Sequence, residues 1–501
     1  MTTKTTARQS FDRRRFLAGA GAAGFAAWAA VKTGHAQSKA DKLTFVTLPD
    51  ALAKSDLIWD ASAFDYSVNE YLVSGTGPTY APMNATEAGK NDIPDGKLNW
   101  GIRDQAYTAN LPADYSVPPS TGNGDYTTRV IIYRPHDMKK FSGNLIFESV
   151  HDTGHLVVWA VVNRYLLTRG DIIVHVDLPT HFNRLKKRDP NRYGSLSMAD
   201  RSLFWTSLSQ MATLIKSGGS PSPLPVRGRH LYFTGYSGSA DTVYRFLSYH
   251  HNGTRMPNGS PVFDGYLPMS HIRVVPPIDA VIISPATQSD MFGATSGDSP
   301  ATRAFRKQYD SDLPTARRRR FEVPGAFHGP LPEPEPGMAV PPQDDHEGNP
   351  FAVCSTSQKW PADAEPSHVP NRALMEACFH HASQWVEKGM APPHSPLIET
   401  GPNDVILTDE NGNARGGLRL PDMAVPTDTF IPATLWQTPN CNATGYRVPF
   451  SREKLVTLYG TRERYLIAYD AAADKLVAEG FLLPDGAAQL KKDRRFLAPV
   501  F

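Results

Sequence analysis

Short apolar runs alternate with amphipathic segments along the chain from about residue 128 onwards. The runs are rich in β-branched residues, which is typical of strands covered on both faces. We predict strands over residues 129–133, 144–150, 171–177, 230–236, 264–269, 278–284 and 320–323. Apolar residues recur at helical spacing between them, which predicts helices over residues 159–168 and 203–215. Alternating strands and helices predict an α/β fold with a mostly parallel sheet and helices on both faces.

The segments that flank this series differ from it in composition. The segment before it is rich in Pro, Gly, Asn and Asp with short apolar pieces, which predicts a β- and loop-rich extension. After a helix predicted over residues 372–389, β-like pieces around 416–420 and an amphipathic stretch over 465–480 close the chain. We therefore divide the chain into an N-terminal segment (1–36), a β/loop-rich extension (37–127), an α/β core (128–400) and a C-terminal extension packed on the core (401–501).

Residues 1–36 have the pattern of an export signal rather than of a folded segment. Residues 13–17 have the sequence Arg-Arg-Arg-Phe-Leu, and a Gly- and Ala-rich apolar stretch leads from them to a small-residue end at Ala36. This order resembles the twin-arginine (Tat) signal of bacteria, except that Asp12 stands where Ser or Thr is usual. The apolar stretch is shorter than the ~20 residues that span a bilayer. We expect cleavage after Ala36, no stable membrane anchor afterwards, and a periplasmic or secreted protein.

Composition and charge exclude several classes of partner. The 52 Lys and Arg residues are balanced by 50 Asp and Glu residues, so the net charge does not favour nucleic acid, a membrane surface or a strongly acidic partner. A small molecule is the expected partner. With 43 Pro and 38 Gly beside 40% hydrophobic residues, the chain is predicted to be globular with long connections. One connection, the Pro-rich and acidic loop 330–345, is interpreted as either a lid or a solvated loop.

Three cysteines, Cys354, Cys378 and Cys441, follow the predicted signal. An oxidising compartment allows one disulfide among them and leaves one thiol unpaired. Cys354 and Cys378 are the nearest pair in sequence, so a bridge between these two is the preferred prediction. Three reduced thiols are the alternative.

The strongest local motif lies at residues 235–239, where Gly-Tyr-Ser-Gly-Ser joins a predicted strand to an amphipathic helix. This setting matches the nucleophile elbow Gly-x-Ser-x-Gly, in which a serine sits on a strained strand-to-helix turn. Small residues are needed two places before and after that serine because the strand and the helix approach closely, and Ser239 replaces the final glycine. Ser237 is therefore the candidate nucleophile. The alternative is that Ser237 only caps the helix.

A serine nucleophile needs a histidine base that is oriented by a carboxylate, and in this fold both follow the serine, the acid first. Asp290 follows the strand predicted over residues 278–284 and is the candidate acid. His328 follows the last strand of the alternating series, which singles it out among 16 histidines as the candidate base. Two competing carboxylates receive other interpretations: Asp264 caps or turns the backbone at a strand start, and Glu322 lies inside a strand.

The oxyanion that forms in such a reaction needs backbone N–H donors. One is expected from Gly238, directly after the nucleophile. The other is expected from Val150 or His151, in the loop after the strand over residues 144–150.

The same loop also permits a second interpretation, as a metal site made by His151, Asp152 and His155. The sequence offers no further ligand at a suitable spacing, which argues against that site. We therefore expect neither a metal ion nor an organic cofactor.

Several motifs in combination resemble the bacterial family of alpha/beta hydrolase domain-containing proteins, whose members often carry Tat signals. The resemblance runs from about Tyr66 to the C-terminus and includes Thr-Gly-Tyr-Ser at 234–237 and Val-Pro-Gly-Ala-Phe-His at 323–328. Further matching motifs lie at residues 128–135, 141–144, 264–266, 288–291, 385–393 and 417–421. The resemblance implies the α/β-hydrolase fold and a triad of Ser237, Asp290 and His328. Gly238 departs from the family, because relatives often carry a larger polar residue there.

These features predict an exported serine hydrolase that cleaves a small or medium organic ester through an acyl-enzyme. Because one fold can host several reactions, cleavage of a lactone, an amide or a C–C bond next to a ketone is the first alternative. The second alternative is a non-catalytic periplasmic binding protein on a hydrolase scaffold. Neither the identity of the substrate nor the oligomeric state follows from the sequence.

Overall fold

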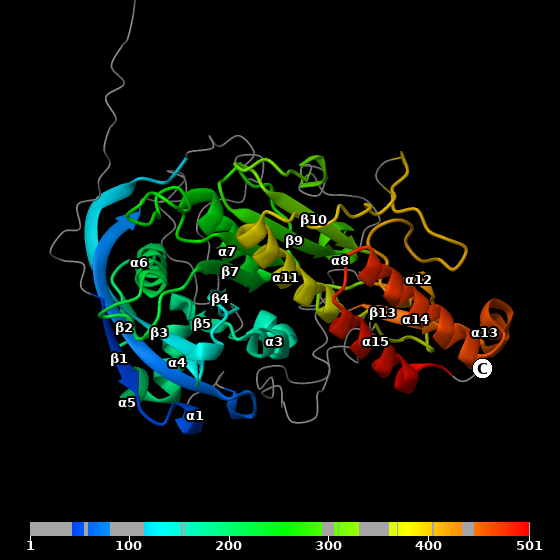
Figure 1. Ribbon diagram of the computed structural model, residues 1–501, viewed down its shortest axis with the longest axis horizontal. Coiled ribbons are helices and arrows are strands. Elements are labelled where there is room, and N and C mark those ends of the chain that lie inside the picture. Colours follow the sequence, from blue (N-terminus) through cyan, green and yellow to red (C-terminus); the bar gives the residue numbers. More distant parts are fainter. Residues whose placement is uncertain are drawn as a thin grey trace, which may run out of the picture. The chain divides into compact units, whose positions relative to one another are not determined.

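The computed structural model describes residues 43–54, 59–80, 115–151, 154, 156–292, 305–308, 310–329, 360–367, 369–402, 405–432 and 445–499 (Figure 1). The predicted signal, the predicted lid loop, Cys354 and Cys441 lie outside these residues. The described residues fall in one unit that extends from Asp41 to Phe501. Within them, no helix is both long and apolar enough to cross a membrane.

A ten-stranded sheet forms the framework of the described residues. Strands β5, β4, β7, β8, β9 and β10 are parallel neighbours in that order, and β3, β2 and β1 extend the sheet beyond β5 in antiparallel fashion. The predicted α/β fold with a mostly parallel sheet is confirmed. The strands are β1 (Thr44–Leu48), β2 (Tyr66–Tyr80), β3 (Pro119–Pro135), β4 (Asn144–Ser149), β5 (Ile172–Val176), β6 (Ser197–Met198, paired with β3), β7 (His230–Tyr236), β8 (Gly265–Met269), β9 (Val281–Thr287) and β10 (Arg318–Val323).

Two apolar cores lie on opposite faces of this sheet, because side chains alternate along each strand. On β4, Ile146 belongs to one core and Phe147 to the other. Helices α3 (Val157–Arg169) and α11 (Arg372–Lys388) supply the first core, and α6 (Leu203–Ser217) and α7 (Gly238–Tyr249) supply the second. Both faces are therefore covered by helices, as the near-continuous apolar runs of the central strands predict.

The antiparallel end of the sheet begins earlier in the chain than the composition predicts. The expected boundary at residue 128 lies inside β3, which pairs with β2 from Tyr66 opposite Pro135 to Tyr80 opposite Pro119. The segment 119–127 is rich in turn-forming residues, yet it is a strand because β2 lies beside it. Ser74 and Thr127, for example, join their hydroxyls at 2.8 Å across the pair. Pairing with a neighbouring strand here overrides local propensity.

A buried ionic cluster ties the antiparallel strands to the parallel part of the sheet. Glu70 on β2 and Arg129 on β3 are fully buried and form an ion pair. The Arg129 guanidinium also lies 3.0 Å from Asp177, directly after β5, and Arg192 donates to Glu70 at 2.9 Å. Burial would raise the pKa of both carboxyls, but the arginines outweigh burial and hold each pKa below its usual value. The cluster therefore stays ionised in the core.

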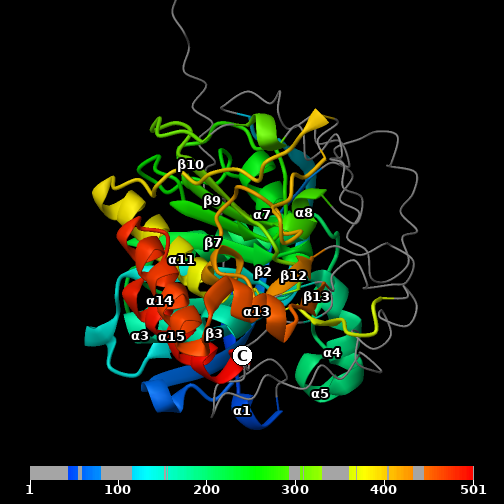
Figure 2. The same ribbon diagram turned by 90° about the vertical axis from the view of Figure 1, so that its right-hand side faces the viewer.

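The C-terminal residues pack against α11 on the first core. Tyr465, Leu476 and Leu490 are buried there together with Leu374 of α11. Helix α15 (Pro484–Leu497) packs against α11, and α14 (Arg462–Ala478) packs against α15. Figure 2 shows these three helices. The β-like piece expected at 416–420 is not a strand. Gly416 makes an isolated bridge to Ile398, and positive φ angles at Gly416 and Gly417 turn the backbone away from an extended path.

The remaining elements are short helices around the sheet and the parts of the C-terminal region. They are α1 (Ala51–Lys54), α4 (Phe182–Arg188), α5 (Pro190–Tyr193), α8 (Gln288–Phe292), α12 (Pro421–Ala424), α13 (Arg452–Tyr459), α14 (Arg462–Ala478), α15 (Pro484–Leu497), the 3-10 turns Ser62–Phe64, Met138–Lys140 and Pro179–His181, and a small sheet of β11 (Glu365–Pro366), β13 (Tyr446–Pro449) and β12 (Asp428–Ile431).

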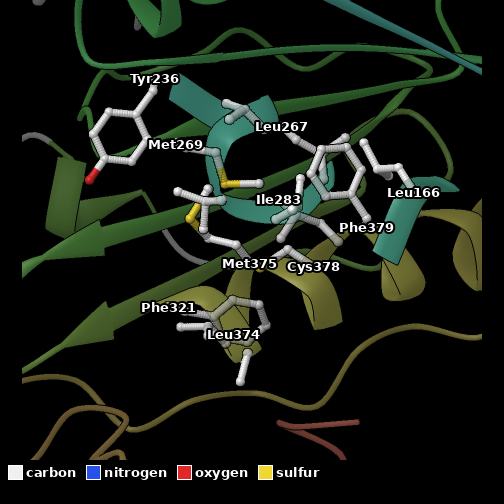
Figure 3. Close-up of a cluster of buried hydrophobic side chains, with 14 of the residues drawn as sticks. Leu166, Tyr236, Leu267, Met269, Ile283, Phe321, Leu374, Met375, Cys378 and Phe379 are labelled. Atoms are coloured by element: carbon white, nitrogen blue, oxygen red, sulfur yellow. The ribbon is translucent and has the colours of Figure 1, made fainter. Parts of the chain in front are cut away.

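Cys378 is a free, fully buried thiol on the inner face of α11. It packs in the first core, where Figure 3 shows it among side chains that include Ile283 and Phe379. Burial raises the pKa of this thiol. The predicted bridge to Cys354 is therefore corrected: the position of Cys378 on a core-facing helix surface encloses its sulfur in apolar side chains.

We predict that replacing Glu70 by Gln lowers the free energy of unfolding by about 3–5 kcal/mol, because two arginines then remain buried without their carboxylate. Urea unfolding followed by tryptophan fluorescence measures this change. The control is Asp65→Asn, which breaks the exposed pair with Lys140 at 2.8 Å; its urea midpoint is expected to match the wild type. Equal midpoints for Glu70→Gln and wild type would contradict the role given to the cluster.

Candidate active site

The order of the parallel strands places a crevice at the carboxyl end of β4. The chain leaves β4 through α3 toward β5, whereas β7 lies on the other side of β4 and leads into α7. Helices α3 and α7 pack on opposite faces of the sheet. Because the connections after β4 and β7 leave on opposite faces of the sheet, the strand order has a topological switch point here. Ligands of open α/β sheets bind at such points. Val150 and His151, directly after β4, and the turn after β7 stand at this edge of the sheet.

Ser237 occupies the turn after β7 in a strained conformation. Its φ of 52° and ψ of −117° are rare for residues other than glycine. The turn is sharp because the strand and the helix meet closely: a Cβ on Gly235 would lie 2.5 Å from the carbonyl carbon of Ser239. The Ser239 hydroxyl accepts the Tyr236 N–H at 2.8 Å and lies 2.9 Å from the Tyr236 carbonyl oxygen. Ser239, which replaces the final glycine of the motif, therefore fixes the backbone of the turn through these two hydrogen bonds.

The three residues predicted as a triad lie side by side in one hydrogen-bonded line. His328 Nε2 is 2.7 Å from Ser237 Oγ, and His328 Nδ1 is 2.5 Å from Asp290 Oδ1. With Nδ1–H donating to the carboxylate, Nε2 is left to accept the serine proton. The His328 side chain is 22% exposed and that of Asp290 4% exposed, so the imidazole is partly open to solvent and the acid end of the line is buried.

Asp290 is held by residues that the sequence analysis did not identify. It lies in the short helix α8, directly after β9, rather than in an open loop. Its Oδ2 accepts hydrogen bonds from the Ser270 hydroxyl at 2.7 Å and from the Thr287 N–H at 2.8 Å. Ser270 and Thr287 stand at the carboxyl ends of β8 and β9. That position is the signal that could have identified them, because carboxyl ends of parallel strands border the crevice.

The backbone of His328 is also fixed. Its carbonyl oxygen accepts a hydrogen bond from the Tyr236 hydroxyl and lies 3.5 Å from the Ser270 hydroxyl, whose proton goes to Asp290. Tyr236 therefore links the turn that bears Ser237 to the turn that bears His328. In Figure 3 its ring borders the apolar cluster while its hydroxyl points away from that cluster. The middle residue of Gly-Tyr-Ser, which the motif leaves unspecified, thus has a defined structural role.

One of the predicted oxyanion donors is wrong. The Val150 N–H donates to the Val176 carbonyl at 3.0 Å, which extends the β4–β5 pairing by one residue and occupies this donor. His151 follows Val150 directly. Gly238 is the first residue of α7, where an N–H has no acceptor within the helix. The donor roles of Gly238 and His151 stay predictions.

The positions of Asp264 and Glu322 can be compared with the roles predicted for them, and the loop after β4 with the alternative of a metal site. Asp264 accepts the Leu231 N–H at 2.7 Å beside Lys216, which agrees with a capping role. Glu322 lies buried in β10 and accepts the Ile398 N–H at 2.8 Å. Asp152 and His155 lie outside the described residues. Among the residues that are described, no group of three or more His, Cys, Asp or Glu side chains is arranged to hold a metal ion.

Comparison with known proteins identifies the family. A family model for the alpha/beta hydrolase domain matches residues 28–492. The chain belongs to this hydrolase family. No curated protein matches it.

Three solved structures are similar to the hydrolase at low identity. A protein named as a dienelactone hydrolase from Klebsiella pneumoniae is 13% identical, with a TM-score of 0.25, over 43% of this chain and 85% of that one. Est1E from Butyrivibrio proteoclasticus is 12% identical, with a TM-score of 0.25, over 40% of this chain and 86% of that one. EstA from Aspergillus niger is 12% identical, with a TM-score of 0.20, over 29% of this chain and 27% of that one.

Burial and charge shift the pKa values of His328 and Asp290 in opposite directions. Burial lowers the pKa of His328, but the charge of Asp290 and the hydrogen bond to it outweigh burial and raise that pKa above 6.5. Burial raises the pKa of Asp290, but His328, Thr287 and Ser270 outweigh burial and lower that pKa below 3.8. Asp290 is therefore an anion at neutral pH and stabilises the imidazolium form of His328.

We predict that the Asp290→Asn substitution lowers the pKa of His328 to below 6.5. Without the carboxylate charge, burial is left as the main influence and disfavours the imidazolium. A titration of the imidazole Cε1–H signals by NMR measures the pKa, with His328→Gln identifying the signal among 16 histidines. An unchanged His328 pKa would contradict the role given to Asp290.

Proposed function

We propose that the hydrolase is a serine hydrolase that cleaves carboxylic esters through an acyl-enzyme. The observation that carries this proposal is the line of hydrogen bonds from Ser237 Oγ through the His328 imidazole to Asp290. A serine hydroxyl is a weak nucleophile near neutral pH, and a neutral imidazole at 2.7 Å is in position to remove its proton. The strained turn supports the same role, because it presents Ser237 at the crevice.

In the first half of the reaction, His328 Nε2 takes the proton of Ser237 as its Oγ bonds to the ester carbonyl carbon. The carbonyl oxygen becomes an oxyanion, and we assign its stabilisation to the N–H groups of Gly238 and His151. Asp290 holds the imidazole in the required tautomer and stabilises its charge. The tetrahedral intermediate then breaks its bond to the alcohol oxygen, and His328 gives its proton to the departing alcohol.

In the second half, water replaces the alcohol. His328 removes a proton from the water as its oxygen bonds to the acyl carbon. The bond from that carbon to Ser237 Oγ then breaks, Oγ recovers the proton from His328, and the carboxylic acid leaves. Partial exposure of the His328 side chain supports this step, because water has to reach Nε2.

We predict that Ser237→Ala and His328→Ala each lower kcat on short p-nitrophenyl esters by about 10⁴–10⁶-fold while the fold is retained. Ser237→Ala should also abolish labelling by a fluorophosphonate probe. The matched control is His394→Ala, which removes another histidine paired with an aspartate but with no serine partner; it should retain both activities. Absence of Ser237 labelling in folded wild-type protein would overturn the proposal and favour a binding protein on a hydrolase scaffold.

The ester part of the proposal is tested separately with a substrate panel. If Ser237 is labelled but p-nitrophenyl esters are not turned over, while a lactone, amide or β-diketone is cleaved, the triad stands and the ester assignment is wrong.

We further propose that the hydrolase is exported by the Tat route and acts in the periplasm or outside the cell. The twin arginine at residues 13–14 and the small-residue end at Ala36 support this proposal. In a bacterium with a Tat translocase, the full chain should appear in the periplasm with a new N-terminus at Gln37. Replacing both Arg13 and Arg14 by Lys should leave the precursor in the cytoplasm. Recovery of uncleaved wild-type chain from the cytoplasm alone would contradict export.

A further inference from the structure

A second strained serine stands beside the candidate nucleophile. In the part of the chain that the structure describes, four residues other than glycine have a positive φ: Asp50, Asp65, Ser237 and Ser270. The two aspartates are exposed and belong to a residue type that adopts this conformation more readily than most. Ser237 and Ser270, with φ angles of 52° and 50°, directly follow the neighbouring strands β7 and β8. Strain of this kind is concentrated at functional sites, so Ser270 is a candidate for a functional role.

The two strained turns are joined through the backbone. The Ser237 N–H donates to the carbonyl of Met269, the last residue of β8, at 3.1 Å. On the other side of β8, the Ser270 N–H donates to the carbonyl of Pro285 on β9 at 3.0 Å. Ser270 therefore lies between the turn that bears the nucleophile and the strand that leads to the candidate acid.

The Ser270 side chain determines which way that acid faces. Its hydroxyl donates to Asp290 Oδ2 at 2.7 Å, and the Thr287 N–H donates to the same oxygen at 2.8 Å. The other oxygen, Oδ1, lies 2.5 Å from His328 Nδ1. Ser270 is 3% exposed, so this hydrogen bond is shielded from solvent. With two donors on Oδ2, the carboxylate is turned so that Oδ1 faces the imidazole.

This hydrogen bond accounts for a strained serine at position 270. Glycine adopts a φ of 50° without a steric penalty, but it has no hydroxyl to donate to Asp290. The hydroxyl is also placed beside the base, because its oxygen lies 3.5 Å from the His328 carbonyl oxygen. The strained backbone at Ser270 thus brings one side chain next to both the acid and the turn that bears the histidine.

We propose that Ser270 is a positioning residue for the triad: its hydroxyl fixes the orientation of Asp290 and, through Asp290, that of the His328 imidazole. This inference rests on the proposed function. In this role Ser270 acts through the acid and not on the substrate. Its loss should therefore lower kcat with little change in KM, because the orientation of the base matters in the transition state and not in ground-state binding.

The test compares Ser270→Ala with Ser270→Gly. Both variants lack the hydroxyl, but only glycine also relieves the strain, so the urea midpoint of Ser270→Gly should lie above that of Ser270→Ala. We expect kcat on a p-nitrophenyl ester to fall about tenfold in both, as for loss of a hydrogen bond to a charged group, with KM within about twofold of wild type. If Ser270→Ala does not fold, Ser270→Gly gives the same kinetic test.

A double substitution tests whether Ser270 acts through Asp290. The readout is the rate at which the fluorophosphonate probe labels Ser237, which can be followed over long times in slow variants. Ser270→Ala should lower this rate about tenfold in the wild type but less than about twofold in the Asp290→Asn background, because the carboxylate that Ser270 orients is then already lost. An equal loss in both backgrounds would show that Ser270 acts by another route.

The matched control is Ser284→Ala. Ser284 is also a buried serine at the sheet, on β9, but its hydroxyl lies 3.2 Å from the hydroxyl of Tyr244 instead of donating to the acid. The same chemical change at this position should alter the urea midpoint while kcat and the labelling rate stay at the wild-type values.

Four outcomes would overturn the inference: wild-type kcat in folded Ser270 variants, a loss that appears in KM instead of kcat, an equal loss in the Asp290→Asn background, or an equal loss in Ser284→Ala. Failure of the proposed function gives a different result, because wild-type protein would then neither turn over the ester nor react at Ser237 with the fluorophosphonate probe.

Discussion

The close approach of β7 to α7 is the constraint on which the rest of the site depends. There is no space for a Cβ at Gly235, and the turn that results places Ser237 at a φ of 52°. Residues held in such conformations persist only where the surroundings determine them. Here the surroundings are the two apolar cores on the two faces of β7, the second of which also contains α7, and the hydroxyl of Ser239, which binds both polar backbone groups of Tyr236.

Tyr236 connects this turn to the histidine. Its hydroxyl donates to the carbonyl of His328, and the Ser270 hydroxyl beside that carbonyl donates to the carboxylate of Asp290. Three turns from distant parts of the chain are therefore joined by hydrogen bonds other than those between the side chains of Ser237, His328 and Asp290. The distance from Ser237 Oγ to His328 Nε2 is set mainly by this outer set of contacts, because side chains alone could adopt other rotamers. Asp290 and His328 are therefore positioned by the residues that bind them, Ser270 and Tyr236.

What could be predicted from the sequence depended on how local each signal was. Ser237 was identified because the motif and its strand-to-helix setting lie within a dozen residues, and Asp290 and His328 followed from the order of elements. Val150 was misassigned because its N–H is occupied through the register of β4 against β5, which no local pattern records. The ionic cluster around Glu70 was missed for the same reason: it joins residues that are 59 and 122 positions apart. Strand 119–127 had a turn-like composition that a neighbouring strand overrode.

The two helices at the crevice differ in how their N-termini are used. The first turn of α3 is occupied, since the Glu148 carboxyl accepts hydrogen bonds from the N–H groups of Val158 and Trp159. The first turn of α7 begins with Gly238 beside Ser237, where an N–H points away from any helical acceptor. If both helix ends faced the crevice unbound, an anion could settle at α3 as readily as at the serine. With these two N–H groups of α3 occupied by a carboxyl group, the first turn of α7 is the place suited to negative charge. That place lies beside Ser237, where an oxyanion would form.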